Sequence, residues 1–214
     1  MNNVNAGELR ALLDDGIEKL GLSGITDNQR SQLIEYVLLI NKWNKAYNLT
    51  SVREPKDMVV RHLLDSLAVK PFISGSQVID VGTGPGLPGI PLAIVLPDVQ
   101  FTLLDSLGKR VRFMTQSLYA LGVTNATPLQ TRVEKHQPDT PYDGVISRAF
   151  ASLKDMLHWC AHLVDSQGEF LALKGQFPQS EIDEVSDHFQ ITKVHNLTVP
   201  GLEGERHLVT ITKA

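Results

Sequence analysis

The stretch VIDVGTGPGLPG, at residues 78–89, decides the fold that this chain of 214 residues is expected to adopt. It begins with a short apolar run, passes through three glycines at alternate positions (Gly82, Gly84 and Gly86), and continues into a helical pattern over residues 88–95. Glycine suits a tight turn between a strand and a helix, because it accepts positive φ angles and lets a ligand approach the backbone without a Cβ atom in the way. The stretch therefore predicts a strand over residues 77–81, a ligand-binding turn and a helix.

Strand-like and helix-like runs alternate along the chain after this turn. Stripes of apolar residues predict helices at 111–121 and 153–163. Apolar runs predict further strands at residues 101–104, 127–130, 144–147, 170–173, 189–199 and 207–212. This alternation is typical of an α/β fold, a doubly wound Rossmann-like sheet whose strands are mostly parallel. The last two runs look like a closing pair of strands around the turn at Pro200 and Gly201, and we expect the last strand to be antiparallel. We place this domain at residues 76–214.

The first third of the chain differs, since residues 8–70 show only helical periodicity. Thr26 to Gln29 has the form of a capping box that opens a second helix, and Pro55 is well placed to open a third. A break at residues 70–76, with proline, glycine and serine, separates this part from the alternating pattern. We therefore expect an N-terminal helical extension at residues 1–75.

Composition and charge exclude several classes of protein. With 20 basic and 24 acidic side chains, a net charge of −4 and a pI of about 6.0, the chain cannot coat nucleic acid by bulk charge, so such a contact needs a local patch. The first twenty residues carry four acidic side chains and no apolar signal-peptide core, and no window approaches the ~18 consecutive apolar residues of a membrane span. We expect a cytoplasmic protein without membrane contact.

The single cysteine, Cys160, argues for a reducing compartment, because an intramolecular disulfide has no second cysteine. It lies between His158 and His162, which are one helical turn apart but offer too few ligands for a zinc site. We expect no metal, and we interpret Cys160 as a core residue, since free cysteines are commonly buried.

The geometry predicted for the glycine turn favours a ligand that contains a nucleoside. Asp105 closes the second strand, 21 residues after Gly84, and a carboxylate at that place accepts hydrogen bonds from ribose hydroxyls. Residues 84–89 formally match the dinucleotide pattern G-x-G-x-x-G, which alone is a weak signal. Asp80 favours S-adenosylmethionine instead, because a carboxylate there would repel a pyrophosphate and suit an ammonium group. Two prolines in the turn also remove N–H groups that a pyrophosphate would need.

Several segments together carry a family resemblance. The turn, with Asp80 before it and Asp105 after it, resembles that of a class I S-adenosylmethionine-dependent methyltransferase. The wider set of segments is similar to the bacterial ribosomal RNA small subunit methyltransferase G family, also called glucose-inhibited division protein B, which modifies N7 of a guanine in 16S rRNA. These segments are KWNKAYNLT at 42–50, RHLLDS at 61–66, the glycine turn, LLDS at 103–106, KR at 109–110, SRA at 147–149, ALKG at 172–175 and GERH at 204–207.

The resemblance implies a site for S-adenosylmethionine. Gly82 and Leu87 would line its methionine and ribose part, so that a side chain at Gly82 would enter the cofactor space. Val133 and Glu134 would flank the adenine, although from the residues alone they suggest an ordinary surface turn. Arg148, after the fourth predicted strand, would close the site between cofactor and substrate. The expected cofactor-binding residues are Gly82, Gly84, Leu87, Asp105, Val133, Glu134 and Arg148.

The resemblance also implies a substrate, 16S ribosomal RNA, within a small-subunit particle. Guanine N7 carries a free lone pair in the plane of the ring, so its methylation needs no general base and depends on proximity and orientation. No residue is therefore assigned as catalytic, and His62 and Arg148 are candidates for positioning the substrate. Candidate RNA contacts are the basic residues Lys42, Lys45, Arg61, Lys109 and Arg110.

The third predicted helix offers a polar face for the RNA. The apolar stripe within residues 60–67 supplies the core packing, which leaves Arg61, His62, Asp65 and Ser66 without a structural duty. In the alternative interpretation, His62 and Asp65 lie three residues apart on the helix and simply pair with each other.

Two other functions stay open on the sequence. A formal dinucleotide pattern would also fit an NAD-dependent oxidoreductase with a Rossmann domain. A non-catalytic RNA-binding protein could use the same fold without methyl transfer.

Overall fold

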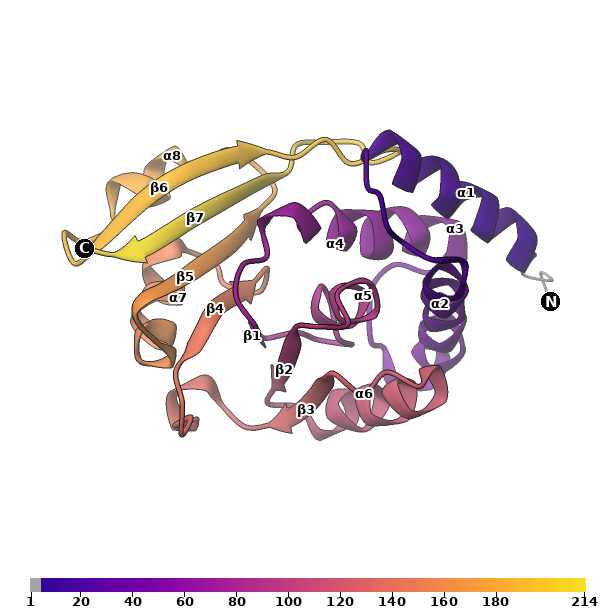
Figure 1. Cartoon of the computed structure of the whole chain (residues 1–214), viewed down its shortest axis with the longest axis horizontal. Helices are drawn as coiled ribbons and strands as arrows, with labels where there is room; N and C mark the ends of the chain where they lie inside the picture. The colour runs from indigo at the N-terminus through magenta and orange to yellow at the C-terminus, as the bar shows by residue number, and fades with distance from the viewer. Residues whose placement is uncertain (1–4) are drawn as a thin grey trace.

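A seven-stranded sheet runs through the molecule, with helices on both of its faces (Figure 1). The computed structural model describes residues 5–214. The spatial order of the strands is β3-β2-β1-β4-β5-β7-β6; β7 pairs antiparallel with both β5 and β6, and the other pairs are parallel. The strands are β1 Gln77–Val81, β2 Gln100–Asp105, β3 Ala126–Gln130, β4 Tyr142–Ser147, β5 Val164–Lys174, β6 Phe189–Asn196 and β7 His207–Lys213. The predicted α/β fold, with a mostly parallel sheet and an antiparallel last strand, is confirmed.

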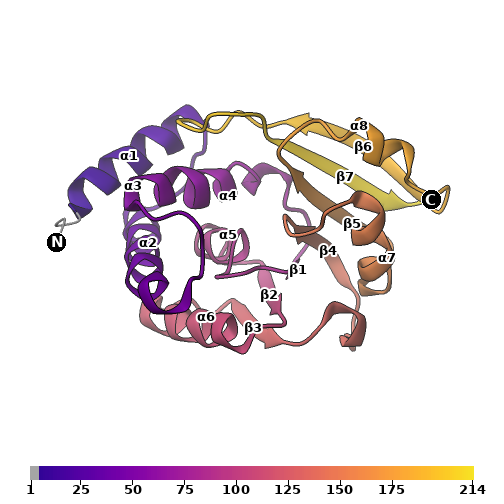
Figure 2. The ribbon, with the colours of Figure 1, turned by 180° about the vertical axis from the view of Figure 1, so that it is seen from behind.

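The helices fall into two groups along the chain. The N-terminal group is α1 Ala6–Lys19, α2 Asp27–Tyr47, α3 Pro55–Met58, the π-helical η1 Val59–Leu64 and α4 Asp65–Leu67. The second group is α5 Gly89–Val95, α6 Gly108–Leu121, α7 Leu153–Cys160 and α8 Gln179–Asp183. Short 3-10 turns are η2 Lys70–Phe72, η3 Val133–Lys135 and η4 Ala161–Leu163. Figure 2 shows α1, α2 and α3 at the end of the molecule that lies opposite β6 and β7, with α4 nearer the middle.

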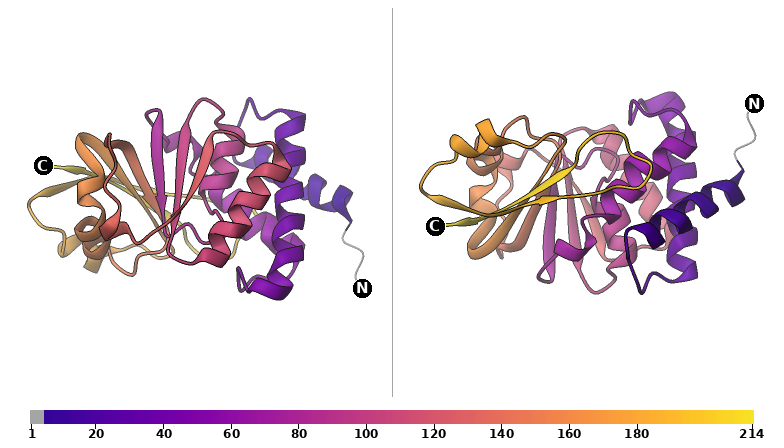
Figure 3. Two further views of the ribbon diagram at one scale, coloured as in Figure 1. Left: turned by 90° about the horizontal axis from the view of Figure 1, so that it is seen from below. Right: turned by 90° about the horizontal axis from the view of Figure 1, so that it is seen from above.

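Two hydrophobic cores lie on the two faces of the sheet, because side chains alternate along each strand. Val78 and Ile146 belong to the core with α5 and α6, whereas their neighbours Ile79 and Val145 belong to the core with α7. Figure 3 shows the resulting layers, with α7 on one side of the sheet and α6 and then α2 on the other.

The first core continues from the sheet into the N-terminal helices. Leu13 of α1, Ile40 of α2 and Leu64 of η1 are buried in the same cluster as Val78 of β1. The division into 1–75 and 76–214 therefore follows the change in secondary structure, while the hydrophobic packing crosses it.

Polar contacts fix α2 against the ends of two other helices and against the glycine turn. The side-chain amides of Gln29 and Gln32 donate to the carbonyls of Ile94 in α5 and Leu121 in α6, at 2.8 and 2.7 Å. These carbonyls lie in the last turns of their helices, where intrahelical partners are absent. The buried hydroxyl of Tyr36 donates to the carbonyl of Pro85, at 2.8 Å. The extension thus holds the turn that follows β1.

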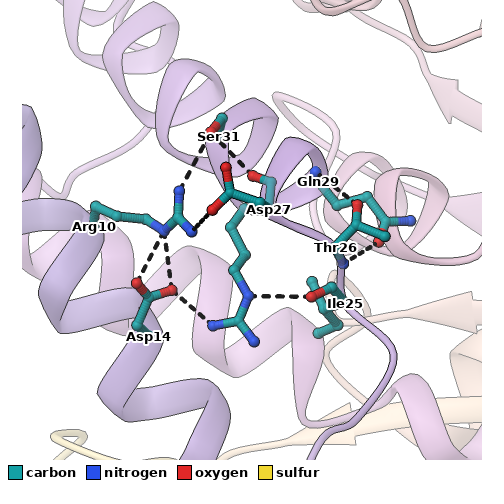
Figure 4. Close-up of polar contacts among 8 residues, drawn as sticks. Arg10, Asp14, Ile25, Thr26, Asp27, Gln29 and Ser31 are labelled. Carbon is teal, nitrogen blue, oxygen red and sulfur yellow. Dashed lines mark hydrogen bonds and ion pairs between the residues drawn. The ribbon is translucent and has the colours of Figure 1, made fainter.

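An ion-pair network joins α1 to the start of α2 (Figure 4). Arg30 donates to Asp14 at 2.7 Å, and Arg10 donates to Asp14, Asp27 and Ser31. Because these side chains are partly exposed, the network orients the two helices more than it stabilises them.

The predicted capping box at the start of α2 is confirmed. The hydroxyl of Thr26 accepts from the Gln29 amide at 3.2 Å, and the Gln29 side chain accepts from the Thr26 amide at 2.8 Å.

The prediction of a free polar face on the third helix is wrong. Val59–Leu64 winds as a π-helix, whose i→i+5 pattern displaces side chains from the faces that a regular helical period assigns. His62, Asp65 and Ser66 are buried, and Arg61 alone of the predicted face is exposed. The continuous helix formed by α3, η1 and α4, here called the front helix, is therefore buried along its apolar stripe and along most of the predicted polar face.

Replacing Gly16 with alanine should destabilise the protein. An added Cβ at this position in α1 would overlap a methyl group of the buried Leu64 and lie 3.0 Å from its Cγ. We expect overpacking of about 1–3 kcal/mol, offset by about 1 kcal/mol from the better helix propensity of alanine. Urea unfolding measures the net loss. Glu18→Ala, exposed on the same helix, should stay within about 0.5 kcal/mol of wild type. A Gly16→Ala variant that is more stable than wild type by about 1 kcal/mol, the full gain in helix propensity, would contradict this packing.

Candidate functional site

A first pocket lies where the carboxyl ends of β1, β2, β3 and β4 meet. The strand order reverses between β1 and β4, and ligands of open α/β sheets bind at such a point. The pocket has a volume of about 360 Å³, within the range of small-molecule sites. Its lining residues are Val81, Gly82, Leu104, Asp105, Ser106, Arg110, Thr131, Arg132, Val133, Glu134, Ala149 and Phe150.

The glycine turn borders this pocket in a conformation that other residues rarely adopt. Gly82, Gly84 and Gly86 have φ angles of 69°, 64° and 107°. The Gly84 amide donates to the carboxylate of Asp105 at 3.0 Å, and the Leu107 amide donates to its other oxygen at 2.9 Å. Asp105 thus ties the turn to the end of β2. Each carboxylate oxygen has more than one lone pair, so Asp105 can still accept a hydrogen bond from a ligand.

Asp80 does not have the role that the sequence suggested. Its side chain is fully buried and does not line the first pocket. One oxygen accepts from the Thr83 hydroxyl at 2.6 Å and from the Gly89 amide at 2.8 Å. Burial raises the pKa of this carboxyl to about 6. Asp80 therefore braces the turn from inside and does not face an ammonium group of a ligand.

The structure brings most of the predicted cofactor-binding residues together. Gly82, Asp105, Val133 and Glu134 line the first pocket. Gly84 adjoins it through its hydrogen bond to Asp105. Leu87 is buried in the core and lies outside the pocket lining, so the cofactor contact expected of it has no support here.

A side chain at Gly82 would also collide with a neighbouring residue, whereas the sequence predicted an effect on the cofactor space only. Its Cβ would stand 2.7 Å from the Cβ of Ala149, and its backbone conformation would be strained.

Several pocket residues were missed by the sequence reasoning. Ser106, Thr131, Arg132, Ala149 and Phe150 all follow the carboxyl ends of strands. Their position directly after a predicted parallel strand was the signal that could have found them.

A second pocket, of about 340 Å³, lies next to the first. Arg148 lines it, and the next residue, Ala149, lines the first pocket. Its lining residues are Thr50, Ser51, Val52, Arg61, His62, Asp65, Arg148, Leu173, Lys174, Gly175 and Arg206. This lining is polar and rich in cationic side chains.

A buried carboxylate organises the second pocket. Asp65 binds Arg148 at 3.1 Å with one oxygen and Arg206 at 2.9 Å with the other. These residues come from the front helix, the end of β4 and the β6–β7 loop. The alternative in which His62 and Asp65 pair with each other is wrong, because Nε2 of His62 lies 3.0 Å from the Thr50 hydroxyl.

His62 is neutral at physiological pH. Its side chain is 5% exposed, and burial, followed by the nearby charge of Arg148, lowers its pKa to about 4. Among the described residues, its Nδ1 atom has no hydrogen-bond partner. A neutral imidazole does not contribute charge to RNA binding.

The predicted RNA contacts are divided between several places. Arg61 is exposed and lines the second pocket. Arg110 lines the first pocket and binds Asp105 at 3.1 Å, so it belongs to the expected ribose site. Lys109 donates to the carbonyl of Tyr47 at 2.9 Å, which joins the start of α6 to the end of α2. Lys42 and Lys45 are exposed on α2 and line neither pocket.

Within residues 5–214, no three His, Cys, Asp or Glu side chains are grouped so that they could hold a metal ion. Nor is any helix in this range long and apolar enough to cross a membrane. Cys160 is buried in the core, as predicted, and burial raises the pKa of its thiol to about 12.

Comparison with known proteins gives consistent matches in sequence. The family model described as rRNA small subunit methyltransferase G matches residues 29–209. A protein of that name from Alteromonas mediterranea is 66% identical over 96% of this chain and 97% of its own length. Another, from Salmonella arizonae, is 58% identical over 95% of this chain and 96% of its own.

Solved structures match the fold at much lower identity. TrmN from Thermus thermophilus superposes with a TM-score of 0.57 and 17% identity, over 80% of this chain and 53% of its own. An rRNA methylase from Streptococcus thermophilus gives a TM-score of 0.50 and 14% identity, over 70% of this chain and 94% of its own. These likenesses concern the fold alone.

The buried His62 should make the protein acid-sensitive. Between pH 6.5 and about 4 the unfolded chain protonates this residue while the folded chain does not, so acid favours unfolding. We expect the free energy of unfolding of wild type, relative to His62→Gln, to fall by about 2–3 kcal/mol from pH 7.5 to 4.5. Urea unfolding at both pH values measures it. A difference between the two proteins that does not change with pH would show that His62 titrates normally.

Proposed function

Because the chain belongs to the rRNA small subunit methyltransferase G family, we propose that it transfers a methyl group from S-adenosylmethionine to N7 of a guanine in 16S rRNA. The observation that carries this proposal is the pair of adjacent pockets at the carboxyl edge of the sheet, separated at the bond between Arg148 and Ala149. One suits a nucleoside cofactor and the other suits a polyanionic substrate. Family membership sets the NAD-dependent oxidoreductase aside.

The residues of the first pocket fit S-adenosylmethionine. The carboxylate of Asp105 is placed to accept from ribose hydroxyls, and Arg110 beside it keeps that carboxylate in position. Val133 and Glu134 offer an apolar and a polar flank for the adenine. The methionine part would pass Gly82, where no Cβ obstructs the backbone.

The proposed methyl transfer depends on how the protein orients the guanine and the cofactor, and it requires no proton transfer. Bound S-adenosylmethionine supplies an electrophilic methyl group, whose bond to sulfur breaks as a bond to N7 forms. The N7 lone pair is free, so no proton has to be removed, in accord with the neutral and buried state of His62. Arg148 lies at the junction of the two pockets and can fix the guanine relative to the methyl group.

The second pocket has the charge that a nucleic-acid substrate needs. Arg61, Arg148 and Arg206 provide guanidinium groups, and Asp65 holds two of them in place. Phosphates of the RNA are favoured partners for such groups. The exposed Lys42, Lys45 and Lys109 would extend this contact outward. Because the chain as a whole is acidic, a small-subunit particle in the cytoplasm is the proposed substrate, rather than free RNA.

Methyl transfer to ribosomal RNA tests the function directly. Small-subunit particles and naked 16S rRNA from a strain that lacks this protein are incubated with the enzyme and labelled S-adenosylmethionine, and the modified base is mapped. We expect one methyl group at N7 of one guanine, with the particle as the better substrate. Absence of transfer to either would support the alternative of a non-catalytic RNA-binding protein.

Asp105→Ala should weaken cofactor binding. The substitution removes the ribose acceptor and releases the Gly84 amide, and a hydrogen bond to a charged group contributes about 1.5–3 kcal/mol. We expect the Kd of S-adenosylhomocysteine to rise about 10- to 100-fold by calorimetry. Asp143→Ala is the matched control, since Asp143 accepts from the Ser76 and Gln77 amides at the other end of β1. An equal loss of affinity in both variants would contradict the role of Asp105 as the acceptor for the ribose hydroxyls.

Arg61→Ala should weaken binding of the RNA substrate and leave binding of the cofactor unchanged. The guanidinium is exposed in the second pocket and does not line the first. We expect the affinity for S-adenosylhomocysteine to be unchanged and the KM for particles to rise about tenfold, as for loss of one charged contact. Lys56→Ala is the control, because Lys56 of α3 pairs with Glu8 and does not line the second pocket, and this variant should behave as wild type. Wild-type kinetics of Arg61→Ala would mean that the RNA is bound elsewhere.

A further inference from the structure

Residues 148–152, between β4 and α7, form a wall between the two pockets. Arg148 lines the second pocket, whereas Ala149 and Phe150 line the first. The segment is neither helix nor strand, so its shape depends on contacts from outside it. Whatever holds this wall therefore acts on both pockets at once.

The first half of the wall is attached to the glycine turn. The Ala149 amide donates to the Ser147 hydroxyl at 3.1 Å, and that hydroxyl donates to the Val81 carbonyl at 2.7 Å. Ala149 also stands against Gly82, where it leaves no room for a Cβ. This half of the wall is thus fixed to β1.

Lys174 and Glu181 hold the second half. The ammonium group of Lys174, at the end of β5, lies 3.3 Å from the carbonyl oxygens of both Phe150 and Ala151. It also binds Glu181 of α8 at 2.7 Å, and the same carboxylate oxygen accepts from the Leu153 amide at 2.8 Å. One ion pair therefore holds the wall at Phe150 and Ala151 and at the start of α7, where Leu153 follows it.

Each N–H donor of the Lys174 ammonium group has an acceptor within the protein. An ammonium group has three N–H donors, and the structure supplies three acceptors, one from Glu181 and two from wall carbonyls. The side chain is 11% exposed. An RNA phosphate would have to displace one of these acceptors. Although Lys174 lines the second pocket, its ammonium group is thus already occupied by contacts with Glu181 and the wall.

We propose that Lys174 is a positioning residue, which sets the affinity of the first pocket for S-adenosylmethionine by holding the Phe150 wall from the side of the RNA pocket. The inference rests on the proposed function, since it takes the first pocket as the cofactor site. Its consequence is that loss of a residue in the second pocket weakens binding in the first, even when RNA is absent.

Calorimetry with S-adenosylhomocysteine on the RNA-free protein tests this inference. Lys174→Met should raise the Kd about tenfold, and Glu181→Gln should raise it less, because an amide oxygen still accepts from Leu153. Lys193→Met, on the exposed side of β6, is the matched control and should bind as wild type. Circular dichroism confirms folding, and steady-state kinetics should show a raised KM for S-adenosylmethionine.

The outcomes separate this inference from the proposed function. If wild type fails to bind S-adenosylhomocysteine, the proposed function fails. If wild type binds and the folded Lys174→Met binds equally well but has a raised KM for particles, Lys174 is an RNA contact and the inference is overturned. If Lys174→Met does not fold, Glu181→Gln decides, since an unchanged Kd in that variant overturns the inference and a raised one supports it.

Discussion

The tight turn between β1 and α5 is the constraint on which the rest of the structure depends. Two carboxylates hold it from opposite sides, Asp80 from the interior and Asp105 from the pocket. Asp105 accepts from the Gly84 amide of the turn, and Asp80 accepts from the amide of Gly89, the first residue of α5, which has no partner within the helix. Tyr36 then binds a carbonyl of the same turn from α2. The N-terminal helices, the sheet and the pocket are therefore coupled through a few backbone groups.

Local patterns in the sequence were sufficient for the strands, the glycine turn and Asp105, whereas Val133 and Glu134 of the first pocket followed only from the family resemblance. Strand, glycine turn and helix are adjacent along the chain, and the carboxylate at the end of β2 follows from the same motif. The strand predicted at 170–173 is longer, Val164–Lys174, because its first half is mostly polar and exposed and gives no apolar run. The last two strands were predicted as a closing pair around the turn at Pro200 and Gly201.

Contacts between distant segments could not be predicted in this way. Asp65 binds Arg148 and Arg206, which lie 83 and 141 residues later in the chain. A helical period indicates which residues share a face, but it does not indicate what covers that face, and the π-helical turn alters the period itself. The same limit applies to Asp80. Its place near the end of β1 was predicted correctly, but the burial of its side chain in the core was not.

The charge of the second pocket suits both the start and the end of the proposed reaction. Three guanidinium groups, of Arg61, Arg148 and Arg206, face one carboxylate, that of Asp65, while the charges of Lys174 and Glu181 cancel in their own pair. This excess of positive charge attracts the phosphates of an RNA substrate. Methylation at N7 then leaves a positive charge on the guanine ring, which neighbouring guanidinium groups repel. Because Asp65 is already bound by two arginines, it does not trap that cation. The same groups that bind the polyanion thus disfavour the methylated guanine.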